Sequence, residues 1–188
     1  TDTDGGKPGV YDRCMCIAPE GYEGDGFGGH TSASFGDPDD SLFSFIGLYD
    51  CVAYNCGVNS TDLVEGRCER VYSKDGRFRM VAGNATATVK LLDCFIYRSG
   101  ATNDSFVDPG SLSQSGGGNV LVEGFRAYAE GAWAGVGSGG YNVDFKNCHF
   151  VVDVDDKTFE PEFFRNTSGD LKRFTMNRSV LEYTGWGS

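Results

Sequence analysis

This 188-residue sequence contains no long amphipathic or apolar segment. The nearest approach to a helical pattern is residues 157–165, which Pro161 interrupts, because proline removes a backbone donor and clashes with the preceding turn. No stretch is apolar for long enough to cross a bilayer as a helix. We therefore predict an all-β protein that does not insert into a membrane.

Basic residues are also scarce. Lysine and arginine number 16 against 27 aspartates and glutamates, which gives a net charge of −11. Nucleic acids and anionic membrane surfaces attract basic proteins, so we expect neither as a partner. An acidic surface favours solubility and is compatible with cation binding.

The sequence has only two histidines, His30 and His149, and no Cys-x-x-Cys pair. Zinc sites need such ligands at close spacings, so zinc is not expected. A Ser–His or Cys–His catalytic arrangement has to use one of these histidines, and no such constellation stands out. The glycine runs at 116–118 and 135–140 lack the lysine of a phosphate-binding loop. We predict no catalytic residue and no cofactor.

What the sequence does have is a repeated alternation of apolar and polar residues. Apolar residues recur five and three residues before an anchor residue, at the anchor, and two residues after it, with Gly9 and Ser179 as the exceptions. The residue just before the anchor is charged or turn-forming. The six anchors are Cys14, Cys51, Cys94, Phe125, Cys148 and Ser179. Alternation indicates strands with one buried face. The change of phase at the anchor predicts a strand–corner–strand repeat.

We predict that these repeats form a single-domain parallel β-helix over residues 10–188, preceded by a flexible N-terminal arm of residues 1–9. A β-sandwich or jelly roll, whose strands also alternate, is the alternative. Long loops are expected between the repeats, at 19–41, 58–88, 100–118, 135–140 and 155–170. Within 58–88 we expect a hairpin of 67–72 and 77–82 around Asp75-Gly76, because Asp-Gly is a strong turn signal.

The repeat is clearest in residues 89–100 and 143–150, where hydrophobic residues alternate up to an Asp-Cys or Asn-Cys pair. This pattern resembles the right-handed parallel β-helix (pectate-lyase-like) superfamily. The superfamily includes polysaccharide-cleaving enzymes, phage tailspikes and non-catalytic adhesins, so the resemblance does not choose a function. Its lyases use basic residues near bound Ca²⁺, and the candidates by residue type alone are Lys90, Arg98, Arg126 and Lys146.

Seven cysteines are present: Cys14, Cys16, Cys51, Cys56, Cys68, Cys94 and Cys148. Disulfides formed in an oxidising compartment are the preferred explanation. Equivalent residues of neighbouring repeats lie about 4.8 Å apart, within reach of a disulfide. For Cys94 and Cys148, buried free thiols explain the pattern equally well.

The glycosylation motif Asn-x-Ser/Thr occurs five times, at Asn59, Asn84, Asn103, Asn166 and Asn177. Chance predicts roughly one occurrence from the motif definition. Asn59 and Asn103 are expected in loops that follow a repeat, and Asn177 at an outward strand position. The excess predicts an extracellular glycoprotein that carries N-glycans. The alternative is a bacterial or viral protein, in which the motif has no such meaning.

Acidic residues cluster at two places, which are Asp37, Asp39 and Asp40, and Asp153, Asp155 and Asp156. Clustered carboxylates suit Ca²⁺, but a solvated acidic surface is the preferred interpretation. Asp50 and Asp93 occupy the same position of the repeat, and like charges in neighbouring repeats would repel unless another group relieves them.

Aromatic residues make up 13% of the chain, and outward positions are expected among Tyr11, Tyr49, Tyr54, Tyr97, Tyr128, Trp133 and Trp186. Exposed rings stack on sugars or are buried in protein interfaces. The leading hypothesis is a secreted, non-enzymatic structural or cell-surface glycoprotein, with self-assembly into an extracellular filament. The alternatives are a polysaccharide lyase or glycoside hydrolase of β-helix type, and a carbohydrate-binding module.

Overall fold

The structure is a computed structural model, and it describes residues 9–19, 26–29, 46–56, 59–64, 66–81, 88–99, 107–108, 119–130, 136–138, 142–153, 164–166 and 173–185. The described residues form twenty strands in three sheets and no helix, which confirms the all-β prediction. None of them therefore belongs to a helix that spans a membrane. Of the predicted N-terminal arm, only Gly9 lies within the described residues.

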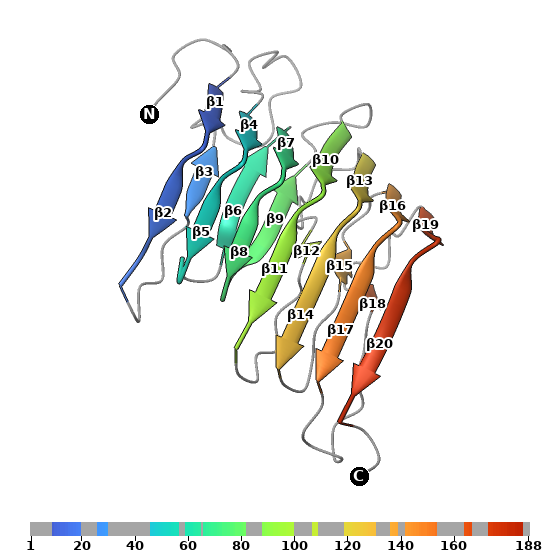
Figure 1. Cartoon of the computed structure of the whole chain (residues 1–188). Helices are drawn as coiled ribbons and strands as arrows, with labels where there is room; N and C mark the ends of the chain where they lie inside the picture. The colour runs from blue at the N-terminus through green and yellow to red at the C-terminus, as the bar shows by residue number, and fades with distance from the viewer. Residues whose placement is uncertain are drawn as a thin grey trace.

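The first sheet has seven strands, one from each repeat that the structure describes (Figure 1). Across the sheet they are β1 (Gly9–Asp12), β4 (Ile46–Tyr49), β7 (Gly66–Glu69), β10 (Thr88–Leu92), β13 (Asn119–Glu123), β16 (Asn142–Lys146) and β19 (Arg173–Asn177). Every neighbouring pair is parallel and in register. Residues at one position of the repeat therefore form a row across the sheet.

The second sheet takes the next strand of each repeat in the same order. Its strands are β2 (Met15–Ile17), β5 (Val52–Tyr54), β8 (Tyr72–Lys74), β11 (Phe95–Arg98), β14 (Arg126–Glu130), β17 (His149–Asp153) and β20 (Val180–Thr184). These pairs are also parallel. Sandwiches and jelly rolls pair their strands antiparallel, so the described strands do not support that alternative.

The third sheet lies behind the other two in Figure 1. Its strands are β3 (Phe27–Gly29), β6 (Asn59–Val64), β9 (Arg77–Val81), β12 (Val107–Asp108), β15 (Val136–Ser138) and β18 (Phe164–Asn166). Four of the predicted loops each contain one of these strands, so the loop prediction is wrong there. The loops are 19–41, 100–118, 135–140 and 155–170. The strands that fall in these loops are β3, β12, β15 and β18, and each has only two or three residues. They are too short, and several are too rich in glycine or polar residues, for alternation to reveal them.

One repeat is missing from the sequence alignment, and it consists of β7, β8 and β9. Its anchor is Val71, which is buried. The predicted hairpin is wrong, because β7 and β9 lie in different sheets and their pairs are parallel. Asp75, expected in the hairpin turn, instead has a φ of 60° and makes the bend between β8 and β9.

A residue in the left-handed conformation separates the first-sheet strand from the second-sheet strand in every repeat. These bend residues have φ between 50° and 67°, and they are Arg13, Asp50, Arg70, Asp93, Gly124, Asn147 and Arg178. The bend shifts the alternation by one residue, which confirms the predicted change of phase. The conformation costs about 1–3 kcal/mol for a residue with a side chain. Backbone bonds to the next repeat offset this cost, as between Asp50 N and Glu69 O at 3.0 Å.

The anchor residues after the bends form a row inside the protein. Cys51, Val71, Cys94, Phe125 and Cys148 are all buried and occupy equivalent positions. This confirms that three of the four anchor cysteines, Cys51, Cys94 and Cys148, share one interior row. However, Val71 and Phe125 separate them. Since neighbouring strands lie about 4.8 Å apart, no disulfide joins one of these three cysteines to another.

Candidate functional site

The outward side chains of the second sheet form two rows that are mainly apolar and aromatic. The first row is Met15, Val52, Tyr72, Phe95, Arg126, His149 and Val180, and the second is Ile17, Tyr54, Lys74, Tyr97, Tyr128, Val151 and Glu182. Residues between the rows, such as Ala53 and Ile96, point inward and are buried, because strand residues alternate. We call this surface the aromatic face.

The outward surface of the first sheet is different in character. Its rows carry charged side chains that pair with one another, such as Arg67 with Glu69 at 2.5 Å and Arg173 with Asp144 at 2.7 Å. Such pairs are typical of a solvated surface. Parallel sheets are usually covered on both faces, and contiguous exposed apolar surface marks interaction sites. The aromatic face is therefore the leading candidate for a functional surface among the described residues.

Neighbouring rings on the aromatic face stack along the rows. Tyr72 and Phe95 have ring centroids 5.4 Å apart and an interplanar angle of 12°. The ring centroids of Tyr97 and Tyr128 lie 5.5 Å apart, and the two rings are almost parallel, with an interplanar angle of 3°. Lys74 Nζ lies 4.7 Å from the centroid of the Tyr54 ring, in cation–π contact. These contacts orient the rings relative to one another.

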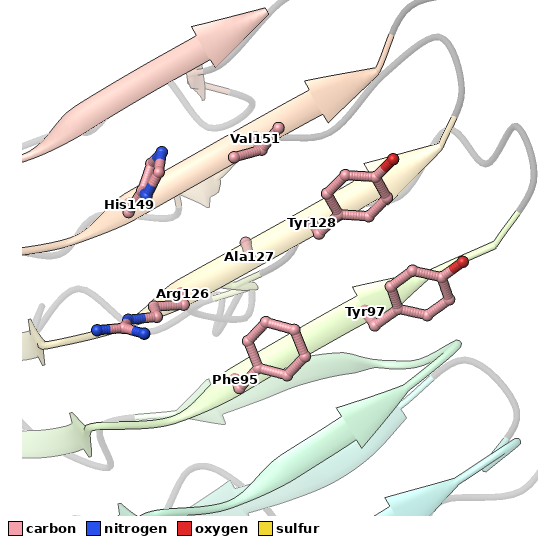
Figure 2. A pocket seen from close by; sticks show the side chains of 7 residues that line it. All are labelled: Phe95, Tyr97, Arg126, Ala127, Tyr128, His149 and Val151. Atoms are coloured by element: carbon pink, nitrogen blue, oxygen red, sulfur yellow. The ribbon is translucent and has the colours of Figure 1, made fainter. Parts of the chain in front are cut away.

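A shallow hollow of about 470 Å³ lies on this face (Figure 2). Its lining comes from three neighbouring strands and comprises Phe95, Tyr97, Arg126, Ala127, Tyr128, His149 and Val151. In Figure 2, Tyr128 lies between Tyr97 and the much smaller Val151. The row of tyrosines thus ends at Val151. Because the valine side chain is shorter than that of tyrosine, space remains beside the Tyr128 ring.

Polar groups stand at one side of the hollow. Arg126 and His149 are exposed and are neighbours in the first row. His149 Nε2 lies 3.2 Å from Glu182 Oε2 on β20. The hollow thus combines ring surfaces with a guanidinium and an imidazole, which can hydrogen-bond a polar ligand while the rings contact its apolar parts.

The structure does not bring together the four basic residues that were considered by analogy with the lyases. Lys90 and Lys146 point outward from the first sheet. Arg98 is buried, and its Nε donates a hydrogen bond to Gly76 O at 3.1 Å. Only Arg126 lies on the aromatic face.

The predicted outward aromatic residues divide between the surfaces. Tyr54, Tyr97 and Tyr128 lie on the aromatic face, and Tyr49 points outward from the first sheet. Tyr11 instead points inward, where it packs against the core, with its ring centroid 5.5 Å from that of Phe27. Trp133 and Trp186 lie outside the described residues.

Sequence reasoning missed Tyr72 and Phe95 as members of the face. The residue that follows an anchor points outward, so Phe95 was recognisable from its position after Cys94. Tyr72 follows Val71, the anchor of the missed repeat, and no alignment on the six recognised anchors reveals it.

The glycosylation motifs fall on different parts of the chain. Asn177 is exposed on β19, which confirms its outward position. Asn59 begins β6, so its assignment to a loop is wrong, and Asn166 ends β18. Asn84 and Asn103 lie outside the described residues. The attachment of glycans remains a prediction.

Among the described residues, no group of three or more histidine, cysteine, aspartate or glutamate side chains is arranged to hold a metal ion. Asp153 Oδ1 accepts a hydrogen bond from Thr184 Oγ1 at 3.0 Å. The other aspartates of the two acidic clusters lie outside the described residues, as does His30. All seven cysteines are free thiols in this structure, so disulfides among them remain a prediction.

Comparison of the chain with protein-family models, with curated proteins and with solved structures finds no match.

Proposed function

We propose that this protein is a secreted, N-glycosylated and non-enzymatic single-domain β-helix whose aromatic face binds polysaccharide. The observation that carries the proposal is the arrangement of Tyr97, Tyr128 and Phe95 around a hollow that also contains Arg126 and His149. The three parallel sheets, in which each repeat pairs with the next, support the solenoid. The five glycosylation motifs support the secreted location.

A polysaccharide fits the chemistry of this surface. Sugar rings present flat patches of C–H groups, which pack on aromatic rings, and hydroxyl groups, which bond to tyrosine, arginine and histidine. The two rows cross the strands and continue beyond the hollow in both directions, through Tyr72 and Tyr54 on one side. An open, elongated surface suits an extended chain better than a small enclosed ligand, for which deep pockets are typical.

Affinity electrophoresis tests the proposal with three classes of polymer: a neutral glucan, a polyuronate and a sulfated polysaccharide. We expect at least one of them to retard the protein, and Tyr128→Ala to weaken that binding about tenfold or more. Tyr49→Ala is the matched control, since it removes an outward tyrosine from the first sheet. The proposal fails if none of the polymers binds, or if both substitutions weaken binding equally.

An activity assay on the same polymers separates binding from catalysis. A lyase produces unsaturated chain ends that absorb in the ultraviolet, and a glycoside hydrolase produces new reducing ends. We expect neither product from a polymer that the protein binds. Product formation that depends on Arg126 or His149 would overturn the non-enzymatic part of the proposal in favour of a polysaccharide-cleaving enzyme.

Self-association is a second candidate, and exposed apolar side chains at both edges of the second sheet favour it. Met15 and Ile17 on β2 are 64% and 66% exposed, and Val180 on β20 is 53% exposed. Among the described strands, β2 and β20 each pair on one side only. Pairing of β20 with β2 of a second copy would bury these residues and extend into a filament, because a head-to-tail contact does not close.

Sedimentation velocity over a range of protein concentrations tests the second candidate. We expect oligomers that Ile17→Lys abolishes, because a charge at the edge prevents close packing. Leu121→Lys is the control, since Leu121 points outward from a central strand of the first sheet. A monomer at all concentrations would exclude self-association. That result would not bear on the proposal that the protein binds polysaccharide.

A further inference from the structure

Two cysteine sulfurs from different repeats are in direct contact. Cys16 lies in β2 of the first repeat, and Cys56 follows β5 of the second. Their Sγ atoms are 3.4 Å apart. The contact follows from the register, which places Cys16 beside Ala53 in the sheet, and from the bend at Asn55, whose φ of 55° turns Cys56 inward.

The other described sulfur contacts are of a different kind. Cys51 Sγ donates to Tyr49 O at 3.2 Å, and Cys148 Sγ donates to Lys146 O at 3.2 Å. Cys94 Sγ likewise donates to Leu92 O at 3.4 Å. Among the described hydrogen bonds of the cysteines, only that between Cys16 and Cys56 joins two sulfurs.

We propose that Cys16 and Cys56 form a disulfide that links the first two repeats when the protein is in an oxidising compartment. A disulfide places its sulfurs about 2.0 Å apart, so the present contact must shorten by roughly 1.4 Å, which side-chain rotation supplies. Cys56 is fully buried beneath Gly26, where an added Cβ would lie only 3.0 Å from the Cys56 sulfur.

The two cysteines have different access to an oxidant. Cys16 is half-buried, whereas Cys56 is enclosed. Burial raises the pKa of the Cys56 thiol to about 11. A thiolate is the attacking species in disulfide exchange, so the more accessible Cys16 reacts first.

A small disulfide such as oxidised glutathione is a sufficient oxidant. The Cys16 thiolate attacks one glutathione sulfur, which forms a mixed disulfide and releases one glutathione as its thiolate. Cys56 then attacks the Cys16 sulfur and passes its proton to the departing glutathione sulfur, which forms the protein disulfide and releases the second glutathione as a thiol. Two protein thiols are oxidised, and one molecule of glutathione disulfide is reduced to two thiols.

The proposed disulfide would stabilise the first repeat, which lies at one edge of the described sheets. β2 pairs only with β5 in the described part of the second sheet, so the first repeat has fewer contacts than a central one. The link also closes the chain between residues 16 and 56, and closing a segment of this length restricts the unfolded state considerably. We expect the oxidised protein to melt roughly 5–15 °C above the reduced protein.

Peptide mapping without reduction tests the pairing on the full chain after equilibration with oxidised glutathione. We expect a linked peptide pair that contains Cys16 and Cys56, while Cys68, Cys94 and Cys148 are alkylated only after denaturation. Reduction should lower the melting temperature of the wild type and of the Cys14→Ser control. It should leave that of Cys16→Ser unchanged.

A linkage of Cys16 or Cys56 to another cysteine would overturn the proposal, as would full alkylation of both after oxidation. Mapping on the wild type decides the pairing even if Cys16→Ser fails to fold. Neither result depends on what the aromatic face binds.

Discussion

The guanidinium of Arg70 binds the carboxylate of Asp50 in the neighbouring repeat through two hydrogen bonds, of 2.6 Å from Nε and 2.9 Å from Nη2. Both residues are bend residues with positive φ, and Asp93 occupies the same position in the next repeat. Arg70 therefore separates two carboxylates that would otherwise be neighbours. The sequence alignment predicts that some group relieves Asp50 and Asp93, and the missed repeat supplies it.

Arg70→Ala should make the stability of the fold depend less on pH in the acidic range. The hydrogen bond from Arg70 lowers the pKa of Asp50, and the same arginine lowers the pKa of Glu69. A carboxyl with a lowered pKa contributes stability above its unfolded pKa of about 4, and the contribution disappears as the pH falls through the folded value. We expect Arg70→Ala to lower the melting temperature at pH 7 and to change it little at pH 2.

The control is Arg178→Ala, which removes an arginine with the same backbone conformation from the last repeat. Its effect should be similar at both pH values. An equal loss at pH 7 and pH 2 for Arg70→Ala would show that the ion pair contributes nothing to stability.

The sequence was sufficient to predict the parts of the fold that alternate strictly. Leu91, Cys94 and Ile96 are buried as their spacing requires, and the same holds for Phe145, Cys148 and Phe150. Each of these strands has one face in the core, so the alternation of apolar and polar residues shows which side chains point inward. The bend before the anchor was recognisable at Asp50, Asp93 and Asn147 and at Gly124, because aspartate, asparagine and glycine tolerate positive φ better than other residues. The remaining bends carry arginine, which gives no such signal.

The missed repeat and most of the third sheet lack such strict alternation of apolar and polar residues. The inward positions of β7 and β8 include Gly66, Cys68 and Ser73, which are small or polar, although Cys68 and Ser73 are fully buried. Ser73 is satisfied by a short hydrogen bond to the buried Ser60 of β6. Both partners come from segments without strict alternation, so only the assembled structure reveals the pair. The aromatic face was predictable in part, since its tyrosines were recognised but not the rows that unite them.

Phe125→Ala should be among the most destabilising single substitutions. Phe125 is fully buried, and its ring centroid lies 5.6 Å from that of Phe78 and 5.9 Å from that of Phe150. It thereby joins the second sheet to the third. Truncation of a buried phenylalanine to alanine costs about 3–5 kcal/mol. Urea unfolding should show this loss, and Phe125→Leu, which retains most of the volume, should lose clearly less. Similar losses for the two variants would mean that the ring packing is not optimised.

Cys94 should make the protein sensitive to alkali. Burial raises the pKa of its thiol to about 12. The folded state therefore favours the neutral thiol, and the resulting stability is complete below the unfolded pKa, near 9, and is lost as the pH rises toward 12. Urea midpoints between pH 7 and pH 10.5 should fall less steeply for Cys94→Ala than for the wild type. Val71→Ala, a truncation at the neighbouring buried anchor that removes no thiol, should retain the wild-type slope. Identical slopes for all three proteins would contradict the assignment.

Gly124 occupies the only bend between the first and second sheets, among the described repeats, where glycine replaces a residue with a side chain. Its φ is 67°, and an added Cβ would meet Asp93 Oδ1 at 2.1 Å, so the aspartate side chain must rotate away. Asparagine tolerates this conformation, and the equivalent Asn147 has a φ of 53°. A β-branched side chain adds a steric conflict of about 1–2 kcal/mol in the left-handed region. Gly124→Val should therefore lose roughly that much more stability in urea unfolding than Gly124→Asn. Equal losses would mean that the contact with Asp93, and not the backbone conformation, requires glycine here.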